Sequence, residues 1–217
     1  MTDPARQSRS QQQRSDETRR ALLDAAVESL TEMGVAKTTT LEVQRRAGVS
    51  RGALLHHFPS KAELIAAAVR HLASMRGREL NEKEARLPAH GDRASAAIDL
   101  LWESFTGPIF YVTMDLRAVA RTDNEFSGML TDVERDIRER IFHQSRRLFG
   151  PEIAGRPGFD RALDMTLQFM IGAAMTAILH REQTRVAGLI EDWKRLFPIL
   201  LDAPAAGKAP GICGGEE

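Results

Sequence analysis

The sequence has few of the features that mark secreted, membrane or metal-binding proteins. Its 217 residues include one cysteine, Cys213, which excludes an internal disulfide framework and a zinc site built from cysteines. The N-terminal stretch has no apolar run, so we expect no secretory signal. The longest apolar run, 169–179, is broken by Thr176, and a membrane-spanning helix needs about 20 apolar residues. These absences favour a reducing compartment, and we expect a cytoplasmic location.

The chain also lacks a net charge, because 30 basic side chains balance 30 acidic ones. The total charge therefore predicts no polyanionic partner, but the charge is unevenly distributed. Residues up to Lys61 include 10 basic and 7 acidic side chains, a net charge of +3 that the rest of the chain offsets. The hydrophobic share of 42% is enough for a sizeable core and excludes a disordered chain. The basic excess lies at the N-terminal end.

Helical periodicity covers almost all of the chain between a polar start and a Gly-rich end. Capping boxes, which satisfy the unpaired amides of a helix start, occur at 39–42, 60–63 and 122–125. The predicted helices begin near residues 15, 39, 50, 60, 92, 108, 122, 158 and 185. Gly34 ends the first, and Gly150-Pro151 ends the one that begins at 122. No segment favours a run of strands, so the predicted fold class is all-α.

The segment 39–61 contains two short helices separated by Ala47-Gly48-Val49-Ser50. Gly48 suits the left-handed backbone that is needed to leave one helix and turn sharply into the next. The spacing of Val43, Ala47, Val49 and Leu54 lets the two helices pack at a steep angle. This pattern is typical of a helix-turn-helix, whose second helix enters the major groove of DNA.

The segment from Thr18 to Val69 resembles the DNA-binding domain of the TetR family of transcriptional regulators. The matching residues are 21–26, Gly34, Thr39, Thr40, 46–50, Gly52, Leu54, His57, Phe58, Ser60, Lys61, Glu63 and Leu64. The resemblance implies a homodimer on a palindromic operator, usually a repressor that a small molecule releases. The family usually has a tyrosine where this chain has Leu55, and a small residue where it has Gln44.

The resemblance and the composition together divide the chain into four parts. Residues 1–14 are a predicted disordered basic arm, and 15–62 are the helix-turn-helix domain. Residues 63–202 are a helical ligand-binding and dimerisation domain, and 203–217 are a disordered tail. The helix that begins at Ser60 runs about 30 Å at about 1.5 Å per residue. We expect it to link ligand binding to the spacing of the dimer's two recognition helices, which face half-sites about 34 Å apart.

The residues expected to contact DNA lie in and beside the two short helices: Thr39, Thr40, Arg45, Ser50, Arg51, Gly52, Leu55, His56 and Lys61. Arg51 either pairs bidentately with guanine or holds a phosphate. Gly52 either allows a close approach of DNA or serves a tight helix start. His57 is expected to pack inward near Phe58. Arg45 and Arg46 are alternatively ordinary solvated charges.

Two further sets belong to the second half of the chain. Aromatic and methionine residues form either an apolar effector pocket or plain core: Trp102, Phe105, Phe110, Tyr111, Met114, Phe126, Met129, Met165 and Phe169. Any ligand is expected to be hydrophobic, with polar contacts from Tyr111, His143 or Gln168. The last two helices form a predicted four-helix dimer interface, through Leu167, Ile171, Ala174, Ile178, Leu189, Trp193 and Leu196.

Two other classes of function compete with a DNA-binding regulator. An enzyme is disfavoured, because the six histidines have no metal-ligand spacing and no phosphate-binding Gly loop occurs. We therefore expect no catalytic site, no cofactor and no metal. A helical dimer that binds a ligand but not DNA is the other alternative, prompted by Leu55 and Gln44. The sequence does not distinguish a repressor from an activator.

Overall fold

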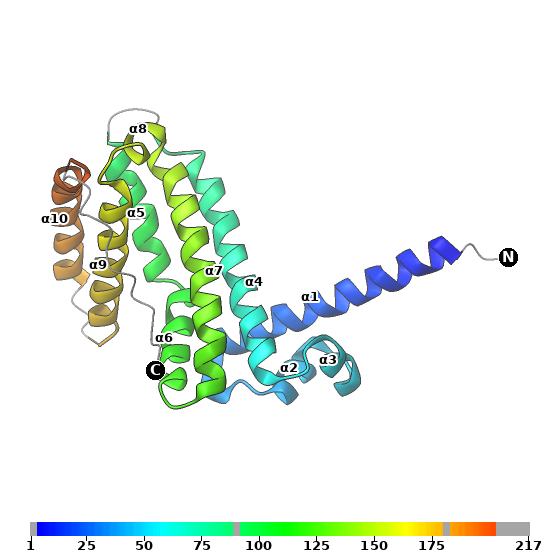
Figure 1. Cartoon of the computed structure of the whole chain (residues 1–217). Helices are drawn as coiled ribbons and strands as arrows, with labels where there is room; N and C mark the ends of the chain where they lie inside the picture. The colour runs from blue at the N-terminus through cyan, green and yellow to red at the C-terminus, as the bar shows by residue number, and fades with distance from the viewer. Residues whose placement is uncertain (1–3, 89–91, 180–182, 203–217) are drawn as a thin grey trace, which may run out of the picture. The chain divides into compact units, whose positions relative to one another are not determined.

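The computed structural model describes residues 4–88, 92–179 and 183–202, and in these ranges the regular secondary structure is helical throughout (Figure 1), which confirms the all-α class. The elements in chain order are α1 (Pro4–Lys37), α2 (Thr40–Ala47), α3 (Arg51–His57), α4 (Lys61–Glu84), α5 (Arg93–Phe105), α6 (Pro108–Ala120), α7 (Asn124–Phe149), α8 (Pro151–Ala154), α9 (Phe159–Leu179) and α10 (Gln183–Leu201). The predicted tail, 203–217, lies outside the described residues.

The chain forms two compact units whose boundary differs from the predicted one at residue 62. Unit 1 combines residues 1–83 with 106–141, and unit 2 combines 84–105 with 142–217. The difference arises because α6 and the first part of α7 belong to the core of unit 1. Val112 and Leu116 of α6 and Val133 of α7 are buried in the same cluster as Leu22 and Ala26 of α1.

The first helix begins much earlier than the sequence predicts. The sequence predicts a disordered arm over residues 1–14, whereas α1 is helical from Pro4 onward. Gln and Arg, which are frequent in this stretch, are good helix formers. The Gln12 and Gln13 side chains donate hydrogen bonds to Asp16 and Glu17, four residues later, and pairs at this spacing stabilise a helix.

Capping residues begin the helices as predicted, with one correction. The Thr39 hydroxyl accepts the Glu42 amide at 3.2 Å, and the Ser60 hydroxyl accepts the Glu63 amide at 3.1 Å. At the start of α7 the cap is Asp123, which accepts the Phe126 amide at 3.2 Å. Thr122, the predicted cap, instead donates to the Val119 carbonyl at the end of α6. The Asp123 carboxylate, one residue later, therefore takes the capping position.

A sharp bend near the end of α1 is built on Gly34 and held by α6. Gly34 has φ 75 and ψ 171, so the helix is broken there, as the sequence predicts. The Val35 amide after the bend lies 3.4 Å from the Asp115 carboxylate. A Cβ added to Gly34 would lie 2.8 Å from the same carboxylate, which is closer than side chains approach. The positive φ therefore favours glycine at this bend, and a side chain there would also displace the Asp115 carboxylate.

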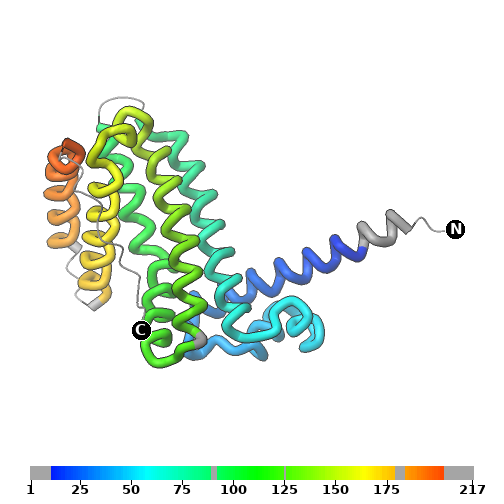
Figure 2. Tube along the Cα trace, viewed as in Figure 1, coloured from blue at the N-terminus to red at the C-terminus, as the bar shows by residue number. Residues whose placement is uncertain are grey.

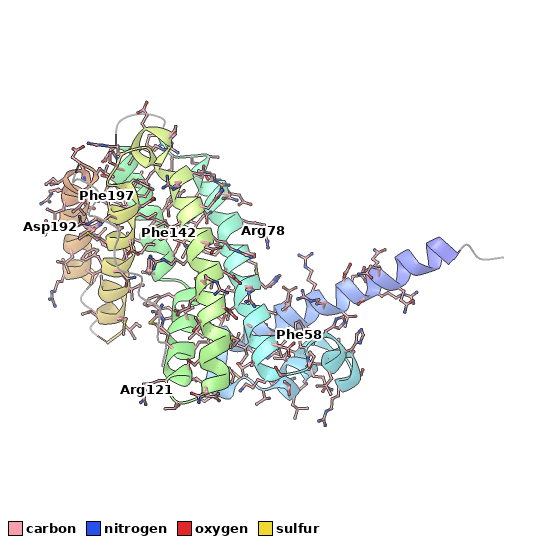
Figure 3. The ribbon with its side chains drawn as sticks, in the orientation of Figure 1. Phe58, Arg78, Arg121, Phe142, Asp192 and Phe197 are labelled. Atoms are coloured by element: carbon pink, nitrogen blue, oxygen red, sulfur yellow. The ribbon has the colours of Figure 1, made fainter. Side chains whose placement is uncertain are left out.

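Unit 2 is centred on three buried phenylalanines. Phe149 stacks on Phe197 with ring centroids 4.9 Å apart and meets Phe159 edge to face at 5.4 Å. Such pairs add stability beyond the area that they bury. Phe197 is labelled on α10 in Figure 3. The short helix α8, which the sequence analysis did not predict, follows Gly150 with its φ of 79.

Candidate nucleic-acid interface

The turn between α2 and α3 depends on one glycine. Gly48 ends α2 in the left-handed conformation, with φ 66 and ψ 28. Its amide donates to the Arg45 carbonyl, and the Val49 amide donates to the Gln44 carbonyl, each at 3.3 Å. These bonds satisfy carbonyls that the end of a helix otherwise leaves unpaired. The role predicted for Gly48 is confirmed, and Figure 2 follows the chain through this turn.

The two short helices are fixed by apolar side chains from both sides of the turn. Val43 of α2 is fully buried and Leu54 of α3 is 2% exposed. Ala47 and Val49 pack against the same core cluster. Phe58, labelled in Figure 3, is buried directly after α3. The predicted helix-turn-helix packing is therefore present, and it fixes which face of α3 points outward.

The outward face of α3 carries the predicted DNA-contacting residues of that helix. Arg51, Gly52, Leu55 and His56 are exposed, at positions that repeat with the helical period. His57 is only partly exposed, and its ring lies 6.4 Å from that of Phe58. Burial, with the charges of His56 and Arg19, lowers the pKa of His57 from its ordinary 6.5. The inward packing of His57 matches the sequence prediction.

The remaining predicted contacts lie at helix starts. Thr39 is exposed before α2, and Ser50 is exposed before α3, where its hydroxyl accepts the Ala53 amide at 3.2 Å. In both caps the oxygen serves the helix, and the hydroxyl hydrogen remains available to donate to a phosphate. Thr40 and Lys61 are the first residues of α2 and α4, and both are partly exposed.

Arg46 is not the solvated charge that was one of its two predicted roles. Its guanidinium lies 2.7 Å from Glu42, 2.7 Å from Glu32 and 3.3 Å from Glu28, and its side chain is 16% exposed. It therefore ties α2 to α1. The glutamates at 28 and 32 share one helix face, and this spacing is the sequence signal that could have revealed the contact.

Arg45, the other arginine of α2, is exposed but paired. Its Nε and Nη2 atoms donate to the two carboxylate oxygens of Glu42 at 3.0 and 2.9 Å. A phosphate would have to compete with this two-pronged pair. The DNA contact assigned to Arg45 therefore stays a prediction that the local geometry does not favour.

Glu42 gives the helix-turn-helix a testable pH dependence. Hydrogen bonds from Arg45 and Arg46 lower the pKa of Glu42 from 4.5 to about 2. A carboxyl group with a lowered folded-state pKa stabilises the fold above its unfolded pKa, and this contribution disappears as the pH falls toward about 2. We expect Glu42→Gln to lower the thermal unfolding temperature at neutral pH, with a smaller difference from the parent protein below about pH 4.

Asp132→Asn is the matched control for this pH experiment. Asp132 pairs with Arg135 on the surface of α7, where the two side chains are 58% and 62% exposed. Exposed pairs contribute little, so this variant should unfold like the parent protein throughout the titration. A Glu42→Gln difference that did not change with pH would contradict the stated role of the Glu42 carboxylate.

Replacing Gly48 in the turn and replacing Gly52 in α3 by alanine are expected to have different effects on the free energy of unfolding. Gly48→Ala is expected to cost roughly 1–2 kcal/mol, because an L-residue resists the left-handed conformation. At Gly52 a Cβ would meet only the Ser50 hydroxyl oxygen, at 3.9 Å. Gly52→Ala should therefore leave stability unchanged or raise it by about 0.4–1 kcal/mol, as in other unstrained replacements of glycine.

DNA affinity separates the two roles considered for Gly52. The helix start has room for a side chain, so a tight start does not require this glycine. If Gly52 allows DNA to approach the backbone, Gly52→Ala will bind DNA more weakly while its denaturation midpoint stays the same or rises. Denaturant titration and gel shift measure the two quantities. Unchanged affinity would show that the absent side chain serves neither purpose.

The predicted effector residues are divided between the two units. Phe110, Tyr111, Met114, Phe126 and Met129 belong to unit 1, and Trp102, Phe105, His143, Met165 and Phe169 belong to unit 2. Phe126 and Met129 pack against the core of unit 1. His143 and Met165 are exposed. These positions favour a structural role for part of the set, and the pocket itself stays a prediction.

Each unit contains a hollow of a size that suits a small molecule. In unit 1 a hollow of about 500 Å³ lies between the end of α1 and α6, and Tyr111 and Asp115 are among its lining residues. In unit 2 a hollow of about 330 Å³ lies between α9 and α10, lined in part by Gln168 and Phe169. Phe169 stacks on Trp193 with ring centroids 4.7 Å apart.

The residues predicted for a dimer interface fall on two faces of α9 and α10. Leu167 and Ala174 are buried within the chain, and Trp193 donates a hydrogen bond to Thr166 at 3.0 Å. Ile171 is partly exposed. Ile178, Leu189 and Leu196 are 48%, 38% and 49% exposed. Two exposed residues that the sequence analysis did not assign, Met175 and Ile199, extend this outward apolar face.

The part of the chain that the structure describes contains no group of three His, Cys, Asp or Glu side chains placed to hold a metal ion. In the same residues, no helix combines the length and hydropathy that a bilayer crossing requires.

Known proteins resemble this chain both in sequence and in fold. Residues 22–68 match the family described as "Bacterial regulatory proteins, tetR family". An uncharacterized HTH-type transcriptional regulator of Mycobacterium tuberculosis is 29% identical over 77% of this chain and 86% of its own length. The HTH-type transcriptional regulator BetI of Brucella suis biovar 1 is 36% identical over 64% of this chain and 71% of its own.

Among solved structures, the multidrug binding protein EbrR complexed with imidazole has a similar fold. The TM-score is 0.60 at 20% sequence identity, and the match covers 94% of each chain. At this identity the likeness supports the fold alone.

Proposed function

This chain belongs to the TetR family of DNA-binding transcriptional regulators, and we propose that it acts as a homodimer on a palindromic operator, as a repressor that a small hydrophobic effector releases. The observation that carries the DNA contact is the outward face of α3, where Arg51, Gly52 and His56 stand together on a helix whose opposite side is buried. The second helix of a helix-turn-helix presents such a face to the major groove. The proposal includes no enzymatic reaction.

The outward face of α9 and α10 supports the homodimer. Met175 and Ile178 on α9, and Leu189, Leu196 and Ile199 on α10, are between 38% and 66% exposed. Gly172 and Gly188 lie on the same helices, and a Cβ added to either would meet nothing within 4 Å. Exposed apolar side chains that recur on one face of a helix favour an interface. Two copies of this pair of helices would form a four-helix interface with two-fold symmetry.

A small-molecule effector is supported by the two hollows and by the solved relative EbrR, a multidrug binding protein that was crystallised with imidazole. We propose an apolar ligand that Phe169 or Tyr111 contacts. Its binding would alter the spacing of the two recognition helices of the dimer through α4, which continues without a break from Lys61 to Glu84. Couplings between sites are typically about 1–3 kcal/mol.

Selection from a random pool of duplex DNA tests this function, with the full-length protein as bait. We expect an enriched palindrome whose half-sites lie about 34 Å apart, or a multiple of that distance. Binding should weaken with salt, because phosphate contacts release counterions. A hydrophobic compound that releases the enriched duplex would identify an effector class.

Two outcomes would contradict the proposal. A protein that prefers no sequence over random competitor is not an operator-binding regulator, whatever its fold. Enrichment of a single, non-repeated site would contradict the symmetric dimer.

A further inference from the structure

The outward face of α3 carries an apolar side chain whose position points to a specific partner group on DNA. Leu54 and Leu55 are neighbours on this helix, but only Leu54 serves the core, at 2% exposed. Leu55 is 45% exposed. Single exposed leucines are common on protein surfaces, so exposure alone would carry no inference. The inference rests instead on the position of Leu55 relative to Arg51.

Leu55 lies one helical turn after Arg51 on the same face. Residues four apart on a helix are neighbours, separated by about 6 Å along the axis. Successive base pairs are about 3.4 Å apart along the duplex. When α3 lies in the major groove with Arg51 at one base pair, Leu55 therefore faces a base one or two steps away. Gly52 lies between them in the sequence and has no side chain that would increase the distance between the helix and the bases.

The side chains of α3 limit which bases this face can read. Residues 51–57 include no Asn or Gln, the side chains that pair with adenine, and no Asp or Glu, which accept from cytosine. Arg51 suits guanine. The group in the major groove that an apolar side chain recognises is the C5-methyl of thymine.

We propose that Leu55 is a specificity-determining residue that contacts the C5-methyl group of a thymine, one or two base-pair steps from the base that Arg51 faces. The inference rests on the proposed operator binding and adds to it a requirement on the half-site. A methyl group removed from water is worth roughly fourfold in affinity. Because a homodimer presents two copies of α3, the operator as a whole would lose roughly 15-fold when both methyl groups are absent.

Deoxyuridine, which is thymine without the C5-methyl group, provides the direct test. The operator enriched by the parent protein is resynthesised with deoxyuridine in place of one thymine at a time, symmetrically in both half-sites. The parent protein is expected to bind one of these duplexes roughly 15-fold more weakly, and to bind the others nearly unchanged. The Leu55→Ala variant should bind that duplex and the thymine operator equally well.

Leu41→Ala is the matched control, because Leu41 is also an exposed leucine, at 71%, but lies on α2. This variant should retain the deoxyuridine penalty at the same position. Circular dichroism of both variants checks that the fold is kept, which the exposure of both side chains favours.

Several results would overturn the inference while leaving operator binding intact. They are half-sites without thymine, a parent protein insensitive to deoxyuridine at every position, or a penalty that persists in Leu55→Ala. Failure to enrich any operator would be a different result, since it would overturn the proposed function and this inference with it.

Discussion

The Leu196→Glu variant is expected to purify as a folded monomer. Leu196 is 49% exposed on α10, so a carboxylate there does not enter the core of its own chain. In the proposed homodimer, two such carboxylates would be removed from water without a partner, at a cost of several kcal/mol. A monomer can occupy only one half-site at a time. Its operator affinity should therefore be lower by roughly 100- to 10,000-fold, because linking two binding modules usually raises affinity by that factor.

Ala187→Glu is the matched control for this variant, because it adds the same carboxylate to the same helix. Ala187 is exposed, but its helical position lies away from the stripe formed by Leu189, Leu196 and Ile199. This variant should remain dimeric and bind operator normally. Analytical ultracentrifugation gives the mass of each variant, and gel shift gives the affinity. A dimeric Leu196→Glu protein would place the interface elsewhere.

Arg51→Ala is expected to cost more DNA affinity than any other single replacement in α3. A bidentate contact with a base is worth about 1–3 kcal/mol, and a homodimer makes it twice, so the expected loss is about 2–6 kcal/mol. The reduction in affinity is therefore at least about 30-fold. The loss should be specific: base preference at one position of each half-site should disappear.

Arg51→Lys distinguishes base reading from a phosphate contact, the two roles that the sequence leaves open. Lysine keeps the charge but cannot form the planar two-pronged pair with guanine. If Arg51 reads a base, the lysine variant loses the preference for guanine together with most of the affinity. If Arg51 holds a phosphate, the lysine variant keeps both. In that case the alanine variant weakens binding to all sequences alike, with a salt slope smaller by about 2.

The sequence predicts local structure well where one residue decides the geometry. Gly48 ends α2 in the left-handed conformation, and Thr39 and Ser60 cap their helices by side-chain hydrogen bonds. The outward position of Leu55 also follows from the sequence, because Leu54 has the spacing that the core requires. Each of these features depends on neighbours within a few residues.

Features that depend on distant partners were missed or misplaced. The tie between Arg46 and the glutamates of α1 joins residues 14 and 18 positions apart. The inclusion of α6 in unit 1 depends on contacts of Val112 and Leu116 with residues of α1. Helical periodicity also failed to separate Leu167, which is buried, from Ile178, which is exposed. Both are apolar and share a helix, and only packing against α10 and α5 decides which is covered.

The charge cluster around Arg46 has a consequence for how the protein would find its operator on a chromosome. Arg45 and Arg46 are paired with Glu28, Glu32 and Glu42. These two basic side chains of α2 therefore attract a distant phosphate only weakly. Binding to random sequence is almost wholly electrostatic. Attraction of this protein to random sequence would therefore depend on its other basic side chains, which leave residues 1–61 with a net charge of +3.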